Sequence, residues 1–99
     1  MQHNVEVCRV AIGALASLSA EYNGSTIELH PHQLVERNGA TYLRAINPAK
    51  TRRADEPPSL GMFHLAGLAN LRLTGEPFEP MPVGDLAAAR PEDRVIATV

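Results

Sequence analysis

Hydrophobic residues near the start of the chain recur at helical spacing. Between residues 5 and 18 they lie three or four positions apart, at Val5, Cys8, Ile12 and Leu15. This is the period of a helix with one buried face. Asn4 precedes the first of them, and Asn is a favoured N-cap residue. The pattern predicts a helix over residues 5–18. Gly13 inside it either allows another element to approach closely or simply weakens the helix, and we favour close packing against a sheet.

The period then changes to the alternation that is typical of strands. Asn23-Gly24 and Asn38-Gly39 each separate two short alternating runs. Asn-Gly is the strongest short hairpin signal, because both central residues of a type I′ turn need positive φ. Two successive hairpins predict four short antiparallel strands. Pro31 is expected to end or kink the second strand, because proline has no N–H to donate.

The pattern breaks at residues 47–59, where three prolines stand among charged residues. Such a segment is typical of a mobile loop. Alternation returns at residues 62–65 and 68–74. These runs predict a fifth strand, with a bend at Gly67 that allows it to continue into another.

The last part of the chain has little period. A single helical turn is expected at residues 85–89, with Asp85 as its N-cap. Residues 94–99 form either a strand that pairs elsewhere or a tail. We therefore divide the chain into a domain at residues 1–80 and an extension, or the start of a following segment, at residues 81–99.

One helix followed by about five short strands joined by tight turns predicts a mainly β fold. The best match is a small five-stranded barrel of the SH3 or Sm type. Closing the sheet would remove the exposed edges that an open meander leaves. The helix would then cover one open end.

Composition narrows the possible functions. The 99 residues are 44% hydrophobic and 20% charged, which is ordinary for a soluble globular domain. A net charge of −2 argues against nucleic-acid binding over the whole surface but leaves room for a local basic patch. Cys8 lies among apolar residues and is expected to be a buried small residue, so a reducing cytoplasm is the expected compartment. No stretch has the roughly twenty apolar residues that would span a membrane.

The chemically distinctive side chains are aromatic or basic: Tyr22, Tyr42, Arg44, Arg52, Arg53 and His64. Tyr42 and Arg44 lie two positions apart in a predicted strand, so both side chains leave the same face. A ring beside a guanidinium suits a base, a phosphate or another anion. Alternatively, Tyr42 fills the core and Arg44 is solvated. Lys50, Arg52 and Arg53 either form a solvated loop or close over an anionic ligand.

Metal and catalytic sites find little support. His30 and His32 flank Pro31 as a possible metal pair, but no matching ligand set accompanies them, so we expect hydrogen-bonded histidines and no metal. The sequence has no Gly-rich phosphate loop, nucleophile elbow or telling pair of carboxylates. We therefore expect no enzymatic activity and no cofactor.

Several short segments follow one another in the order and spacing of a known family. They are AEYNG at residues 20–24, LHPHQL at 29–34, GATYLRA at 39–45, FHLAGL at 63–68 and LRLT at 71–74. Over about residues 5–80 these segments resemble the WYL domain. The resemblance implies an Sm-like barrel with a ligand face at Tyr22, His32, Tyr42 and Arg44, and with the loop arginines nearby.

WYL domains typically lie behind a winged helix-turn-helix in bacterial transcription regulators, including regulators of phage-defence and CRISPR systems. There they are thought to sense a ligand, in some members a nucleic acid, and to pass that state to the DNA-binding part. The resemblance therefore implies a non-catalytic regulatory module. Its expected ligand is an anionic small molecule, such as a nucleotide, or a short single-stranded nucleic acid. Its expected partners are a DNA-binding domain or another protein, with a second copy of the chain as a further candidate.

The sequence departs from the family pattern at three positions. Thr41 stands where the family has Trp, and His64 and Gly67 stand where it has two arginines. Loss of these charges weakens the case for an anionic ligand, and Arg52, Arg53 and His64 are the candidates to replace them. The alternative is a protein-interaction or dimerisation module without a ligand. An Sm-like ring that binds RNA is a third hypothesis, disfavoured by the acidic net charge.

Overall fold

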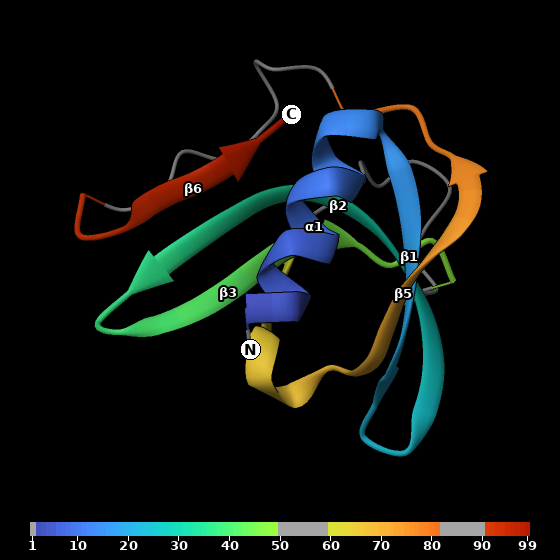
Figure 1. Ribbon diagram of the computed structural model, residues 1–99, viewed down its shortest axis with the longest axis horizontal. Helices are drawn as coiled ribbons and strands as arrows, with labels where there is room; N and C mark the ends of the chain where they lie inside the picture. Colours follow the sequence, from blue (N-terminus) through green and yellow to red (C-terminus); the bar gives the residue numbers. More distant parts are fainter. Residues whose placement is uncertain (1, 50–59, 82–90) are drawn as a thin grey trace, which may run out of the picture.

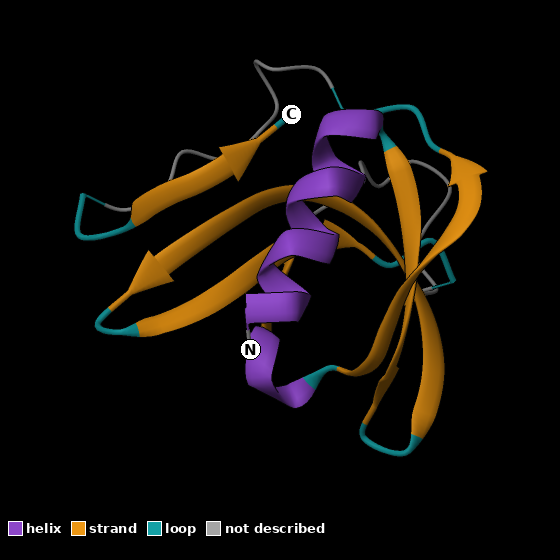
Figure 2. Ribbon diagram, in the orientation of Figure 1, coloured by secondary structure: helices purple, strands orange, loops and turns teal. Residues whose placement is uncertain are grey.

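The computed structural model describes residues 2–49, 60–81 and 91–99. The elements are, in order, α1 (Gln2–Ala14), β1 (Ala16–Tyr22), β2 (Ser25–Arg37), β3 (Ala40–Ile46), β4 (Gly61–His64), the 3-10 helix η1 (Leu65–Gly67), β5 (Ala69–Pro77) and β6 (Arg94–Thr98). Strands make up most of the described chain (Figure 2), which confirms a mainly β fold with an N-terminal helix. The predicted loop residues Lys50, Arg52 and Arg53, and the helical turn at residues 85–89, lie outside the described residues.

The strands form one antiparallel sheet in the order β4-β3-β2-β1-β5, and β6 also pairs with β2. The residues of β2 that pair with β6 pair with β3 as well, so β6 lies along the same edge of β2 as β1. Figure 1 shows α1 lying across the sheet, with β6 and the β2–β3 hairpin on one side and β1 and β5 on the other. Of the two alternatives for the last residues, the structure has the strand.

In the part of the chain that is described, the end strands β4 and β5 do not pair with each other. The sheet is therefore open, and the closed five-stranded barrel expected from the sequence is not shown. The described residues also contain no helix that is long and apolar enough to cross a membrane.

β2 is one long strand where the sequence predicted two. A register shift between Pro31 and Gln33 makes His32 a bulged residue, so the strand is kinked here but not ended. The bulge also changes which positions face the core, from Leu29 before it to Leu34 after it. Proline is tolerated because its missing N–H falls where β2 changes neighbour, after its last pair with β1 and before its first pair with β6.

The helix is displaced from its predicted bounds. It ends before Leu15, whose φ of 53° is the left-handed conformation that commonly terminates helices. Leu18 belongs to β1 and not to the helix. The sequence could not decide between them, because Leu18 fits both the helical spacing before it and the alternation after it. Asn4 lies inside the helix and does not cap it.

The core lies between α1 and the sheet. The helix contributes Cys8, Ala11 and Ile12, and strands and η1 contribute mainly leucines: Leu18, Leu29, Leu34, Leu43 and Leu65. Cys8 is fully buried, which confirms the buried small residue expected from the sequence, and burial raises the pKa of its thiol to about 12. Gly13 is exposed, and a Cβ there would meet nothing within 4 Å. The predicted close packing at Gly13 is therefore wrong.

Candidate functional site

The second hairpin divides its side chains between two faces. Leu34, Leu43 and Ala45 belong to the core cluster. The Asn38-Gly39 turn, with φ values of 51° and 81°, sets the register that pairs the alternate residues of β2 and β3 on the opposite face. We call the surface away from the core the outer face. It comprises the register partners Gln33, Arg37, Tyr42, Arg44, Met62, His64, Val95 and Thr98, together with Val35, whose side chain is fully buried beneath this face.

Tyr42 is the central aromatic residue of the outer face. It lies opposite His64 in the β3–β4 register, and the two ring centroids are 5.0 Å apart with the rings at 70°. On the neighbouring strand, the Cζ atom of Arg37 is 5.9 Å from the Tyr42 ring centroid, within the range of a cation–π contact. Two of the residues predicted from the sequence, Tyr42 and His64, are thus brought together by strand pairing.

Arg44 leaves the same face as Tyr42, as the alternation predicted. Its Nη1 donates a hydrogen bond to Oε1 of Gln33, the residue opposite it on β2. The Gln33 side chain in turn places Nε2 3.5 Å from Oγ1 of Thr98 on β6. The guanidinium is therefore held in place by a nearly buried amide that also reaches the last strand.

Arg37 and Asp93 form a bidentate ion pair that the sequence did not reveal. Nε of Arg37 is 2.5 Å from Oδ1 of Asp93, and Nη2 is 2.8 Å from Oδ2. The Asp93 side chain is 1% exposed. The hydrogen bonds that Arg37 donates to Asp93 raise the pKa of Arg37. Turn register alone would have placed Arg37 next to Tyr42, but no local signal connects it to a residue 56 positions away.

Tyr22 is not part of the outer face. Its ring packs against the core, with its centroid 5.5 Å from that of Phe63 and the rings at 79°. Phe63 lies opposite Leu43, on the core side of the β3–β4 pair. The expectation that Tyr22 shares a ligand face with Tyr42 is therefore corrected: the two rings lie on opposite faces of the sheet.

His32 is fully buried, so its expected place on the ligand face is also corrected. Nδ1 is 2.8 Å from the carbonyl oxygen of His30, and Nε2 accepts the N–H of Met81 at 3.1 Å. These partners require a neutral ring with its proton on Nδ1. Burial lowers the pKa of His32, and the hydrogen bond to the His30 carbonyl only partly opposes this effect. The bulge directs this side chain inward.

His30 and His32 both pack against the ring of Phe78. The His30 ring stacks on Phe78 with centroids 5.0 Å apart, and the His32 ring lies 5.2 Å from Phe78 at a tilt of 45°. His30 Nε2 also lies 3.8 Å from a carboxylate oxygen of Glu28. Among residues 2–49, 60–81 and 91–99 there is no group of three His, Cys, Asp or Glu side chains that could hold a metal ion.

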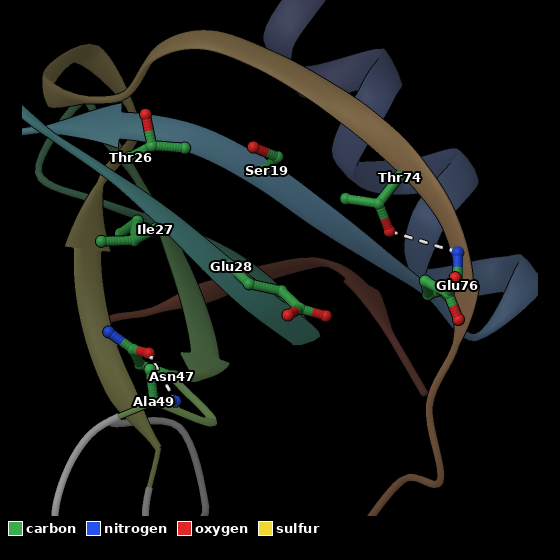
Figure 3. Close-up of a pocket in the computed structure, with 8 residues that line it drawn as sticks. All are labelled: Ser19, Thr26, Ile27, Glu28, Asn47, Ala49, Thr74 and Glu76. Atoms are coloured by element: carbon green, nitrogen blue, oxygen red, sulfur yellow. Dashed lines mark hydrogen bonds between the residues drawn. The ribbon is translucent and has the colours of Figure 1, made fainter.

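An open groove of about 450 Å³ lies elsewhere on the molecule. Its lining is Ser19, Thr26, Ile27, Glu28, Asn47, Ala49, Thr74 and Glu76. In Figure 3, Glu28 lies between Thr74 and Glu76 on one side and Asn47 and Ala49 on the other. Of the predicted ligand residues that the structure describes, none lines this groove. Two carboxylates disfavour an anion there, so the groove does not suit the predicted ligand.

Comparison with known proteins adds no relative: the chain matches no family model, no curated protein and no solved structure.

Proposed function

We propose that this chain is a non-catalytic regulatory module that binds an anionic ligand on its outer face. The ligand class is a nucleotide or a short single-stranded nucleic acid. The observation that carries the proposal is the meeting of Tyr42, His64 and Arg44 on one surface, built by β3 and β4 and supported by β2.

Each of these side chains supplies a different contact. Aromatic rings such as Tyr42 give a base a surface for stacking, worth about 1–3 kcal/mol per base in single-strand binding sites. The His64 Nδ1 accepts the N–H of Ala66 at 3.2 Å. In the neutral ring this leaves the proton on Nε2, a donor for an anion. The Arg44 guanidinium has the planar geometry that binds phosphate or carboxylate.

We further propose that the module is a WYL-like domain with an Sm-like fold, acting in the bacterial cytoplasm with a DNA-binding domain or partner protein. The curvature of the sheet supports the proposal of an Sm-like fold. Tyr22 on β1 contacts Phe63 on β4, although β2 and β3 separate these strands in the sheet. A Cβ at Gly67, in η1, would also lie 3.6 Å from the Tyr22 ring. The sheet therefore bends back towards its own edge, as barrel sheets do.

A second candidate function is protein interaction or dimerisation. Two large hydrophobic side chains of the outer face are exposed, Met62 at 40% and Val95 at 44%. Exposed apolar side chains that flank polar groups suit a protein interface. This candidate uses the same surface without a ligand.

The test is fluorescence anisotropy with a fluorescein-labelled oligothymidine at low and moderate salt. Arg44→Ala should weaken binding about tenfold, as expected for loss of one charged hydrogen-bonding contact. Arg72→Ala is the matched control: it removes the same charge from an exposed position on β5, opposite Ser19 and away from the outer face. Equal affinities in the two variants would refute the ligand site. A dimer in light scattering that Met62→Ser dissociates, with no oligonucleotide binding, would favour the second function.

A further inference from the structure

We propose that Asp93 is a positioning residue of the outer face. It fixes the Tyr42 ring through Arg37, and so makes ligand binding depend on the docking of β6. The part about the ligand rests on the proposed function. The part about the ring does not, because it concerns contacts within the chain.

The first step is the ion pair itself. Both carboxylate oxygens of Asp93 meet separate nitrogens of Arg37, at 2.5 and 2.8 Å. Two parallel hydrogen bonds fix the plane of a guanidinium as well as its position. Because the Asp93 side chain is 1% exposed and that of Arg37 is 20% exposed, water competes little for these bonds. Removing one partner would leave a poorly solvated charge behind.

The second step connects this fixed guanidinium to the aromatic residue. The Cζ atom of Arg37 lies 5.9 Å from the Tyr42 ring centroid, and the centroid of the His64 ring lies 5.0 Å from it. Tyr42 is therefore held between a side chain from β2 and one from β4. A ring whose rotamer is restricted by such neighbours is preorganised to meet a ligand.

The third step involves the other end of β6. Thr98 pairs with Gln33 in the β2–β6 register, and its Oγ1 lies 3.5 Å from Nε2 of the Gln33 side chain. Gln33 accepts the hydrogen bond from Arg44. One strand thus supports Tyr42 through Asp93, just before its start, and supports Arg44 through Thr98 at its end. Linkage then requires that a ligand on the outer face stabilises the docking of β6 in return.

The ring-fixing part is tested without a ligand. The chain has two tyrosines and no tryptophan, so Tyr22→Phe leaves Tyr42 as the sole tyrosine. In that background, Asp93→Asn should reduce the near-UV circular dichroism of Tyr42 and lower its fluorescence anisotropy. Arg94→Gln is the control, because it breaks the neighbouring exposed pair with Glu36, which has an N–O distance of 3.2 Å. Far-UV circular dichroism checks that each variant is folded.

The conservative variant Arg37→Lys keeps the positive charge but loses the bidentate geometry, and it gives a second measurement if Asp93→Asn does not fold. It should also reduce the near-UV signal of Tyr42. An unchanged signal in the folded Asp93→Asn protein, or in Arg37→Lys where the former is unfolded, would overturn the positioning role.

The ligand part uses the full chain and the same labelled oligothymidine. Asp93→Asn should weaken binding about tenfold and Arg94→Gln should change it little. In wild-type protein, amide hydrogen exchange at residues 94–98 should slow when the oligonucleotide is added. If wild type binds and Asp93→Asn binds equally well, the positioning role is overturned and the proposed function stands. If wild type does not bind, the proposed function and the ligand part both fail, and the ring measurements decide the rest.

Discussion

His32 shows how one residue can make stability depend on pH. Burial lowers its pKa from the ordinary value of 6.5, and the hydrogen bond to the His30 carbonyl only partly opposes this effect. The unfolded chain therefore takes up a proton near pH 6.5 that the folded chain takes up only at lower pH. Stability from this residue is complete above pH 6.5 and is lost as the pH falls towards the folded-state pKa. Protonation of Nε2 would also set two donors, N–H of Met81 and Nε2–H, against each other.

We expect the free energy of unfolding of the wild-type protein to fall between pH 7 and pH 5, by up to about 1.4 kcal/mol per pH unit for this one proton. His32→Gln should flatten this part of the profile, because Gln does not titrate. Urea unfolding at a series of pH values measures the slope. His3→Gln, at an exposed position of α1, should keep the wild-type slope. A slope that is the same in His32→Gln and wild type would contradict this account.

At the scale of elements, the Asn-Gly turns show which backbone positions carry strand register. Gly39 has a φ of 81°, a conformation that costs other residues about 1–2 kcal/mol. Gly39→Ala should therefore lower the free energy of unfolding by about that amount. Gly13→Ala should instead raise it by up to about 1 kcal/mol, because Gly13 is an exposed helical residue with space for a Cβ. Urea unfolding compares the two, and a stabilising Gly39→Ala would disprove the turn argument.

The elements that the sequence predicted well are those set by local chemistry. The two turns and the strands beside them follow from Asn-Gly and alternation, and both turns have the expected positive φ values. The helix end was missed because Leu18 fits two periods at once. The bulge at His32 was missed for a different reason. It changes which alternate positions of β2 face the core, and in the sequence this change looks like two separate strands with Pro31 between them.

The candidate site divides in the same way. Alternation was enough to place Tyr42 and Arg44 on one face. The contact of Tyr42 with His64 depends on the pairing of β3 with β4, which are separated by a long connection. Local alternation could not predict this pairing, and only the resemblance to the WYL domain connected the two residues. Asp93 was missed because its partner Arg37 is 56 positions away and nothing in the pattern connects them.

At the scale of the whole molecule, β6 joins the end of the described chain to its middle. It pairs with the second half of β2, and Val99 donates its N–H to the carbonyl of the bulged His32 at 2.9 Å. Ile96, Ala97 and Val99 pack against the core cluster beside α1. Two different kinds of support, core packing and the Arg37–Asp93 pair, therefore come from one short segment.

A chain ending at residue 90 should consequently be less stable than the full chain. Half-burial of Ile96, Ala97 and Val99 corresponds to about 2–4 kcal/mol, since full burial of a Val or Ile side chain is worth about 1.5–3 kcal/mol. This is a large share of the 5–15 kcal/mol that is typical of a domain. Urea unfolding measures the difference, and Arg94→Gln, which breaks the exposed pair of β6 with Glu36, should stay close to wild type. If the shortened chain kept full stability, residues 1–80 would form an independent unit, as the division based on sequence expects. A loss of stability of the expected size would instead show that β6 is part of that unit. Removing β6 would then also disturb the outer face.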